Sequence, residues 1–215
     1  MKYVKPVLSK GLLVVVFIVP LIAIRLASGT DFVINLSATI QQHRLIYLVA
    51  LFCTKTISII YPPLPGIVAT VASIPFVGWE AAYVTDILGS LTGASITFYL
   101  GKRYGLSILN HVLGEKITSK VKTIQLKDQN QIEAAIFLRF AAGGLLSDAL
   151  SWGASLIGFS YISLIAGYII FHLITILPVF IILSTSISVQ TGIIGAVMFF
   201  VAWLVIIKFN GRYFE

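Results

Sequence analysis

The sequence of 215 residues is 58% hydrophobic and only 11% charged, and its mean hydropathy is +1.00. These values exclude a soluble globular domain of ordinary composition and indicate an integral membrane protein. The length allows one compact bundle of several membrane crossings, without an additional soluble domain of ordinary size.

The net charge of +7 would suit a nucleic-acid partner, but the positions of the charges argue against one. Most of the fifteen lysines and arginines flank hydrophobic runs in three segments: Lys2, Lys5, Lys10, Lys102, Arg103, Lys116, Lys120, Lys122, Lys127, Lys208 and Arg212. The positive-inside rule expects this distribution of cytoplasmic segments. We therefore expect a protein of the plasma (inner) membrane with both termini cytoplasmic.

Residues 1–30 predict an N-terminal transmembrane helix that is kinked at Pro20. The segment resembles a signal peptide, but no convincing cleavage site precedes Arg25, and we interpret it as a retained helix. The segment from Asp31 to Arg44 then places its apolar residues near one helical face. That pattern favours a helix lying in the outer interface of the membrane.

Residues 45–80 are apolar but cannot form one straight helix, because Pro62, Pro63, Pro65 and Gly66 interrupt them. We expect a broken helix that enters the membrane, turns at the proline cluster and leaves on the same side. Such a re-entrant hairpin is tolerated where protein or a water-filled cavity shields the freed backbone groups.

Residues 81–100 are predicted to cross the membrane, with Gly89, Gly93 and Ala94 permitting close helix packing. Residues 101–131 follow as a basic cytoplasmic loop. This loop either contacts anionic headgroups or forms a solvated helix, and the sequence leaves both readings open.

Residues 133–151 predict a second hairpin, which enters from the cytoplasmic side. Residues 152–178 then cross outward, and residues 184–215 form a C-terminal transmembrane helix and tail. The predicted fold is therefore an all-α polytopic membrane bundle, in which residues 31–183 form a transport core. Its two opposed re-entrant hairpins form an inverted repeat.

Several short motifs, taken in this order, resemble the DedA superfamily, also called the VTT-domain or SNARE-associated Golgi protein family. The resemblance covers residues 52–178, and its parts are Pro63-Leu64-Pro65-Gly66, Gly89, Gly93-Ala94, Tyr99-Leu100-Gly101-Lys102-Arg103, Gly105, Leu138-Arg139-Phe140, Ser147-Asp148, Ser151-Trp152 and Pro178. It implies two facing re-entrant hairpins, movement of lipids between leaflets, and an arginine in the second hairpin, here Arg139. Some members are proposed to couple transport to protons through two carboxylates, and this chain has Lys55 and Ile67 at those positions. It also has Ala142 in place of a usual proline and Leu145 in place of a second arginine.

Arg139 is the strongest candidate for a substrate-binding residue, because a guanidinium stays charged and presents a planar fork of donors to phosphate oxygens. The alternative is a structural ion pair with Asp148 or Asp86. Asp148 itself either pairs with Arg139, takes up a proton or caps a helix. Of the two acids near residue 80, Asp86 is favoured over Glu80 because it lies deeper in the apolar segment.

Four tip residues and the side chain of Lys55 complete the candidate site. The tip residues Pro65, Gly66, Gly143 and Gly144 free backbone groups that can meet a polar ligand. Lys55 can supply a second phosphate contact, although we expect its long stem to snorkel toward the outer interface. We expect His172 to be a packing residue with its hydrogen bonds satisfied, with proton shuttling as the alternative.

These residues favour a translocator or scramblase of phosphate-bearing lipids, either phospholipid or polyprenyl phosphate. The expected partners are membrane lipids and not nucleic acid. The sequence is compatible with an oligomer. The alternatives are a proton-coupled ion or small-solute transporter and a membrane scaffold. A lipid-phosphate enzyme is disfavoured, because His43, His111 and His172 are scattered and Cys53 is alone. We expect no cofactor, no metal and no catalytic residue.

Overall fold

The computed structural model describes residues 30–61, 64, 66–115, 118–119, 126, 130–142 and 144–184. Within these ranges the side chains of residues 32–33, 112–113, 141–142 and 144–150 are outside the description. The predicted N-terminal helix, the predicted C-terminal helix and tail from residue 185, and the prolines at 62, 63 and 65 lie outside the described residues.

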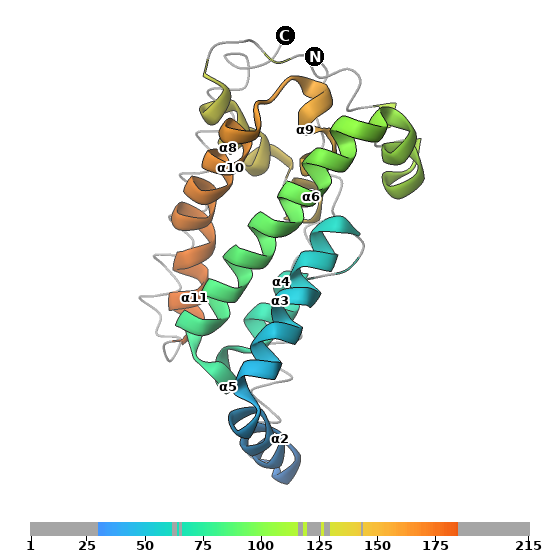
Figure 1. The fold of residues 1–215 in the computed structure, drawn as a ribbon. Coiled ribbons are helices and arrows are strands. Elements are labelled where there is room, and N and C mark those ends of the chain that lie inside the picture. The colour runs from blue at the N-terminus through green and yellow to red at the C-terminus, as the bar shows by residue number, and fades with distance from the viewer. Residues whose placement is uncertain are drawn as a thin grey trace.

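The described elements are all helical, which confirms the predicted all-α class. They are α2 (Asp31–Gln42), α3 (Arg44–Ile60), α4 (Gly66–Ala72), α5 (Ile74–Val77), α6 (Trp79–Leu113), α8 (Gln131–Ala142), α9 (Gly144–Ile157), α10 (Tyr161–Phe171), the π-helical turn η1 (His172–Ile176) and α11 (Leu177–Ser184). Figure 1 shows them as one elongated bundle with α2 at its lower end.

The first helical hairpin consists of α3 and α4. The α3 helix ends at Ile60, and α4 begins at Gly66 and returns alongside it (Figure 1). At the turn, the backbone N–H of Leu64 donates to the carbonyl of Tyr61 over 3.1 Å. The proline cluster therefore breaks the helix where the sequence predicted, because proline offers no N–H to continue it.

The second helical hairpin consists of α8 and α9, which lie toward the opposite end of the bundle from α2 and α5 (Figure 1). The indole N–H of Trp152 on α9 donates to the carbonyl of Ile60 at the end of α3, over 3.1 Å. The two pairs therefore approach each other from opposite ends and are joined at this hydrogen bond.

The predicted boundary between this hairpin and the next helix, at residues 151 and 152, is wrong. The α9 helix continues to Ile157, and the chain turns at Gly158, whose φ of 104° favours glycine. Ser160 then caps α10, its hydroxyl accepting from the N–H of Ser163 over 3.1 Å. The long helix therefore begins at Tyr161 rather than at Trp152.

The α6 helix extends well beyond the crossing predicted at residues 81–100. It runs to Leu113 and bends at Gly105, whose φ is 61° and ψ is −144°. Lys102 and Arg103 therefore lie on a helix, and the first part of the basic segment predicted as a loop at residues 101–131 is helical. A single glycine can redirect the chain at this position without a longer break.

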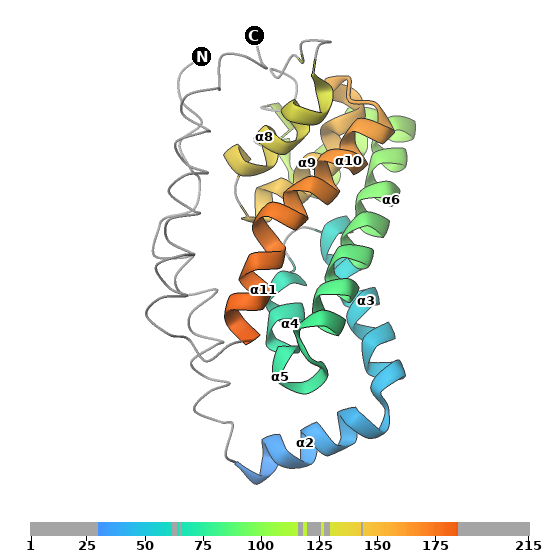
Figure 2. The ribbon, with the colours of Figure 1, turned by 90° about the vertical axis from the view of Figure 1, so that its left-hand side faces the viewer.

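The helices α10, η1 and α11 form one rod from Tyr161 to Ser184, of 24 residues with a mean hydropathy of 2.4. It is the one described helix that is long and apolar enough to cross a membrane. A second is obtained if Ile34–Gln42 and Arg44–Ile60, which meet at an angle of 96°, count as one broken span. The rod descends beside the ascending α6 (Figure 2).

Two glycines one turn apart let α6 approach α3 closely, as the sequence predicted. A Cβ atom on Gly93 would lie 2.6 Å from the Cβ of Ile59, and one on Gly89 would lie 2.8 Å from the Cβ of Lys55. The hydroxyl of Thr56 also donates to the Gly89 carbonyl over 3.3 Å. The glycines therefore set the distance between the two helices that carry most of the buried charge.

We expect Gly93→Ala to destabilise the fold by about 1–3 kcal/mol, because the added methyl group has no space against Ile59. The measurement is equilibrium unfolding of the purified protein in detergent. Leu88→Ala is the matched control, since Leu88 lies on the same helix and its side chain is 51% exposed. Equal stability of the two variants would contradict this account of the α3–α6 contact.

Candidate functional site

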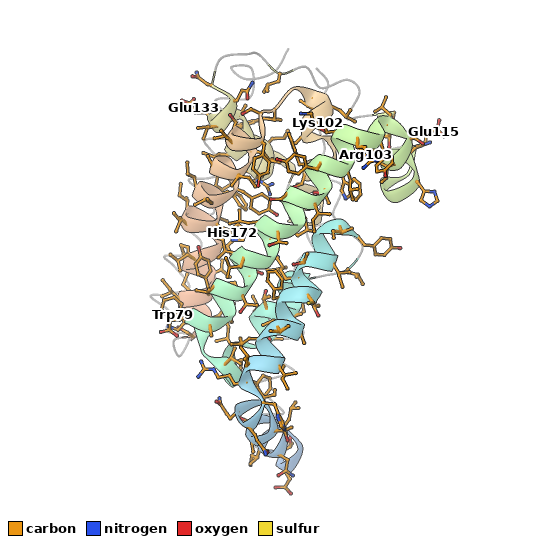
Figure 3. The ribbon with its side chains drawn as sticks, viewed as in Figure 1. Trp79, Lys102, Arg103, Glu115, Glu133 and His172 are labelled. Carbon is orange, nitrogen blue, oxygen red and sulfur yellow. The ribbon has the colours of Figure 1, made fainter. Side chains whose placement is uncertain are left out.

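Buried polar side chains occupy the middle of the bundle, between two apolar clusters. Along α6, Asp86 lies after Tyr83 of one cluster and before Phe98 of the other. Along the descending rod, His172 likewise lies between Leu164 and Phe180. In Figure 3 the labelled His172 lies at a height between Trp79, at the lower end of α6, and Lys102 and Arg103 near the upper end of the bundle.

Asp86 is the centre of this polar layer. Its Oδ1 atom lies 3.1 Å from the Nζ atom of Lys55 on α3 and accepts a 2.7 Å hydrogen bond from the hydroxyl of Thr70 on α4. The side chain of Asp86 is fully buried, and that of Lys55 is 5% exposed. The ion pair and this hydrogen bond together join three helices in the core.

The prediction that Lys55 snorkels toward the interface is wrong. Its stem lies across Gly89, where a Cβ atom would be 2.9 Å from the Lys55 Cγ atom. Gly89 follows Asp86 by three residues on α6, so the missing side chain opens a path from α3 to the carboxylate. The ammonium group therefore turns inward, and a buried opposite charge replaces the hydration that it would find at the interface.

His172 approaches the other oxygen of the same carboxylate. Its Nδ1 atom lies 3.7 Å from Asp86 Oδ2, and neither atom has a hydrogen-bond partner among the described residues. The expectation of a packing histidine with satisfied bonds therefore fails at Nδ1. The imidazole stacks on Tyr168, with ring centroids 5.3 Å apart and an angle of 24° between the planes.

The π-helical turn holds His172 in this position. The backbone N–H of Leu177 donates to the carbonyl of His172, five residues earlier, instead of four. Pro178 follows directly and has no N–H for an α-helical bond. Such single π turns are frequent at functional sites in helices.

Arg139 on α8 contributes the second buried cation. Its Nη2 atom donates to the hydroxyl of Ser151 on α9 over 3.2 Å, and its Cζ atom lies 3.3 Å from the centroid of the Tyr168 ring. The residue is only 2% exposed, and its Nε atom has no hydrogen-bond partner in the part of the chain that the structure describes.

The predicted alternative of an Arg139–Asp86 ion pair is not found. Tyr168 and His172 lie between the two charges, so a guanidinium, two stacked rings, a carboxylate and an ammonium follow one another across the bundle. The face of an aromatic ring attracts a cation, which gives Arg139 a partner that carries no formal charge. No described carboxylate forms a salt bridge with it.

Of the other predicted site residues, the structure describes Gly66 and Gly144. Gly66 is buried and packs directly on Ser58 of α3. A Cβ atom added at Gly66 would lie 2.5 Å from the Cβ of Ser58, so this glycine allows α4 to approach α3. Gly144 begins α9. Pro65, Gly143 and the side chain of Asp148 lie outside the described residues. Glu80 is exposed whereas Asp86 is buried, which agrees with the preference for Asp86.

Three contributors to the layer were missed by reasoning from the sequence. Thr70 and Ser151 are small hydroxyl residues, which in an apolar helix ordinarily bond to their own backbone. Tyr168 stands in an apolar run without any local signal that distinguishes it from a packing aromatic. Only the fold brings Thr70 to Asp86, Ser151 to Arg139 and Tyr168 between two charged groups.

The described layer holds two cations, Lys55 and Arg139, and one anion, Asp86. Among these described side chains positive charge is in excess, and the unpartnered Nε–H of Arg139 suits an anionic group that can accept several hydrogen bonds. No protein-family model, curated protein or solved structure matches this chain. Among the described residues, no group of three or more His, Cys, Asp and Glu is placed to hold a metal ion.

We expect Asp86→Asn to destabilise the fold by about 3–5 kcal/mol, because it leaves the Lys55 ammonium buried without a counter-charge. The double variant Lys55→Met with Asp86→Asn should recover most of the loss, since neither charge then remains. Equilibrium unfolding of the four proteins of this cycle measures the coupling.

The control is Glu80→Gln, which removes an exposed acid from the same helix and should change stability by less than about 0.5 kcal/mol. An Asp86→Asn variant as stable as this control would show that the ion pair contributes nothing to the fold.

Proposed function

We propose that this chain moves phosphate-bearing lipids, either phospholipid or polyprenyl phosphate, between the two leaflets of a membrane, as its resemblance to the DedA superfamily implies. In this proposal α3–α4 and α8–α9 are re-entrant hairpins, each entering the bilayer from one side and turning inside it. Irregular backbone at that depth must be shielded by protein or water, and the helices of both pairs pack on the rest of the bundle: α3, α4 and α9 contact α6, and α8 contacts α10.

The surface of the bundle supports a membrane setting. Leu45, Ile46 and Ile162 are 75%, 69% and 77% exposed. In Figure 3 the labelled charges Lys102, Arg103, Glu115 and Glu133 gather at one end of the bundle. Apolar side chains facing outward along the bundle, with charges at its end, are the pattern that a hydrocarbon core selects.

The observation that carries the proposal is the state of Arg139. A buried guanidinium with an unpartnered N–H, and with an aromatic face and a hydroxyl as its described contacts, is poised to accept an anion. A phosphate oxygen meets both the charge and the geometry of the donors. The Tyr168 contact is the weaker one, so an arriving phosphate can replace it.

The polar layer supplies what a phosphate loses on leaving water. Moving an anion into hydrocarbon costs many kcal/mol unless fixed charges and dipoles take the place of its hydration. Arg139 and Lys55 supply positive charge from two different hairpins, and Ser151 and Thr70 hold these charges in place, the latter through Asp86. The acyl chains remain in the surrounding lipid while the headgroup passes through the layer.

A second candidate is a proton-coupled ion or small-solute carrier. The 3.7 Å gap between His172 Nδ1 and Asp86 Oδ2 favours it, because a proton can be shared there. The two proposals differ in a measurable way. Purified protein in vesicles should move labelled lipid in a headgroup-dependent manner if it is a lipid translocator, whereas a carrier should change the internal pH without any lipid substrate.

We expect Arg139→Ala to lower the initial rate of lipid movement at least about tenfold, since a charge-assisted hydrogen bond contributes about 1.5–3 kcal/mol. Arg139→Lys should retain part of the rate, because it keeps the charge and loses the fork of donors. The assay follows headgroup-labelled phospholipid between the leaflets of vesicles that contain the purified protein.

Arg103→Ala is the matched control for the assay, because Arg103 is an exposed arginine that contacts a tyrosine ring, that of Tyr104, outside the polar layer. Its rate should equal that of the unmodified protein. An Arg139→Ala protein that moves lipid as fast as this control would remove the main mechanistic claim.

A further inference from the structure

The surroundings of Asp86 have the composition of a site for a coupling cation. The carboxylate is fully buried and accepts from the hydroxyl of Thr70, which also bonds within its own helix to the carbonyls of Gly66 and Ile67 at 3.4 and 3.1 Å. Buried acids in membrane segments mark ion pathways and proton relays in transporters. In this chain the ammonium of Lys55 stands at that carboxylate, 3.1 Å from Oδ1.

We propose that Lys55 is a tethered counter-cation that takes the place of an exchangeable coupling ion at Asp86. This inference rests on the proposed lipid translocation and specifies its energetics. With the ammonium in place, neither a proton nor Na⁺ needs to bind during the cycle. Lipid movement by this chain is then passive and follows the lipid gradient alone.

The geometry shows why this cation cannot be exchanged with the solvent. The Lys55 stem lies on Gly89, and its side chain is 5% exposed. A free ion would enter and leave with each cycle and so transmit its gradient, whereas a group bound covalently to α3 returns to the same carboxylate. A ligand drives a conformational change only through its differential binding to two states, and a permanent ligand carries no gradient.

The ionisable groups that face Asp86 come from three of the elements around it. Lys55 lies on α3 and His172 on η1, while Tyr83 lies one turn earlier on α6 with a buried, unpartnered hydroxyl. Thr70 on α4 donates a hydrogen bond and carries no charge. Removing the Lys55 charge leaves Asp86 without its cation, and the carboxylate then becomes neutral by taking a proton from the solvent.

The first test needs no variant. Unmodified protein in vesicles of phosphatidylcholine and phosphatidylglycerol should move labelled lipid at rates within about twofold under an imposed proton gradient, under a Na⁺ gradient and under neither. A rate that follows either gradient would overturn the proposal while leaving lipid translocation intact. If the unmodified protein moves no lipid at all, the proposed function fails first.

The second test removes the Lys55 charge, so that Asp86 must take up an exchangeable proton instead. Lys55→Met keeps the stem and removes the ammonium, so its rate should rise at least about fivefold between about pH 8 and about pH 5.5, as Asp86 takes up its proton. The double variant Lys55→Met with Asp86→Asn should lose that dependence, and Lys102→Met, which removes an exposed lysine from α6, should behave like the unmodified protein. A Lys55→Met rate that ignores pH would contradict the proposal.

A third measurement does not depend on transport. Infrared difference spectra of the detergent-solubilised proteins detect the C=O stretch of a protonated carboxyl group. Lys55→Met should show an additional band of this kind that titrates with pH, beyond the bands of the other carboxyl groups that it shares with the unmodified protein and the double variant. A titrating band in the unmodified protein that disappears in Asp86→Asn would show that a proton already binds beside Lys55, against the proposal.

Discussion

The ion pair between Lys55 and Asp86 is the constraint on which the rest of the core depends. Neither charge is stable alone in an apolar bundle, so each requires the other within hydrogen-bond distance. That requirement brings α3 against α6, and it selects glycine at position 89, where the lysine stem passes. Thr70 on α4 binds the same carboxylate. Both helices of the first hairpin are therefore held against α6 by Asp86, whose charge Lys55 of that hairpin neutralises.

The second hairpin is linked to this pair through aromatic rings. Arg139 lies over the ring of Tyr168, which stacks on His172, and the imidazole faces the carboxylate of Asp86. Rings between two cations keep the positive groups from repelling one another at short range, and they leave the guanidinium without a strong competing anion among the described side chains. These contacts therefore hold the layer together, and the guanidinium keeps the unpartnered Nε–H on which the proposed phosphate contact rests.

The sequence predicts the helical class and the proline break because both follow from local properties. A helix can continue through a single proline, as the rod does at Pro178, but three prolines within residues 62–65 remove too many backbone donors, so a helix must end near residue 62. Asp86 and Arg139 could be singled out for a similar reason, since an ionisable group within an apolar segment must have a partner. Their burial was therefore predictable, whereas their partners were not.

The direction of Lys55 could not be predicted, since it depends on a missing side chain 34 positions later along the chain, at Gly89. The role of Tyr168 depends on two other elements in the same way. The helix boundaries at residues 100 and 151 were placed wrongly because they followed the charges: the basic run from Lys102 was interpreted as a loop, and the second hairpin was ended just after Asp148. Only the observed dihedral angles show that the chain bends at Gly105 and turns at Gly158.

The π-helical turn divides the long rod from Tyr161 to Ser184 into two halves with different surroundings. Leu177 donates to the carbonyl of His172 rather than to that of Leu173, and Pro178 has no N–H to offer Ile174, so successive carbonyls at mid-length lose their α-helical donors. A helix bends most easily where its ladder is interrupted. Below this point Phe180 is held edge-on by Tyr83, and above it Tyr168 and His172 border the polar layer. The upper half can thus bend about this point while the edge-on contact between Phe180 and Tyr83 keeps the lower half against α6.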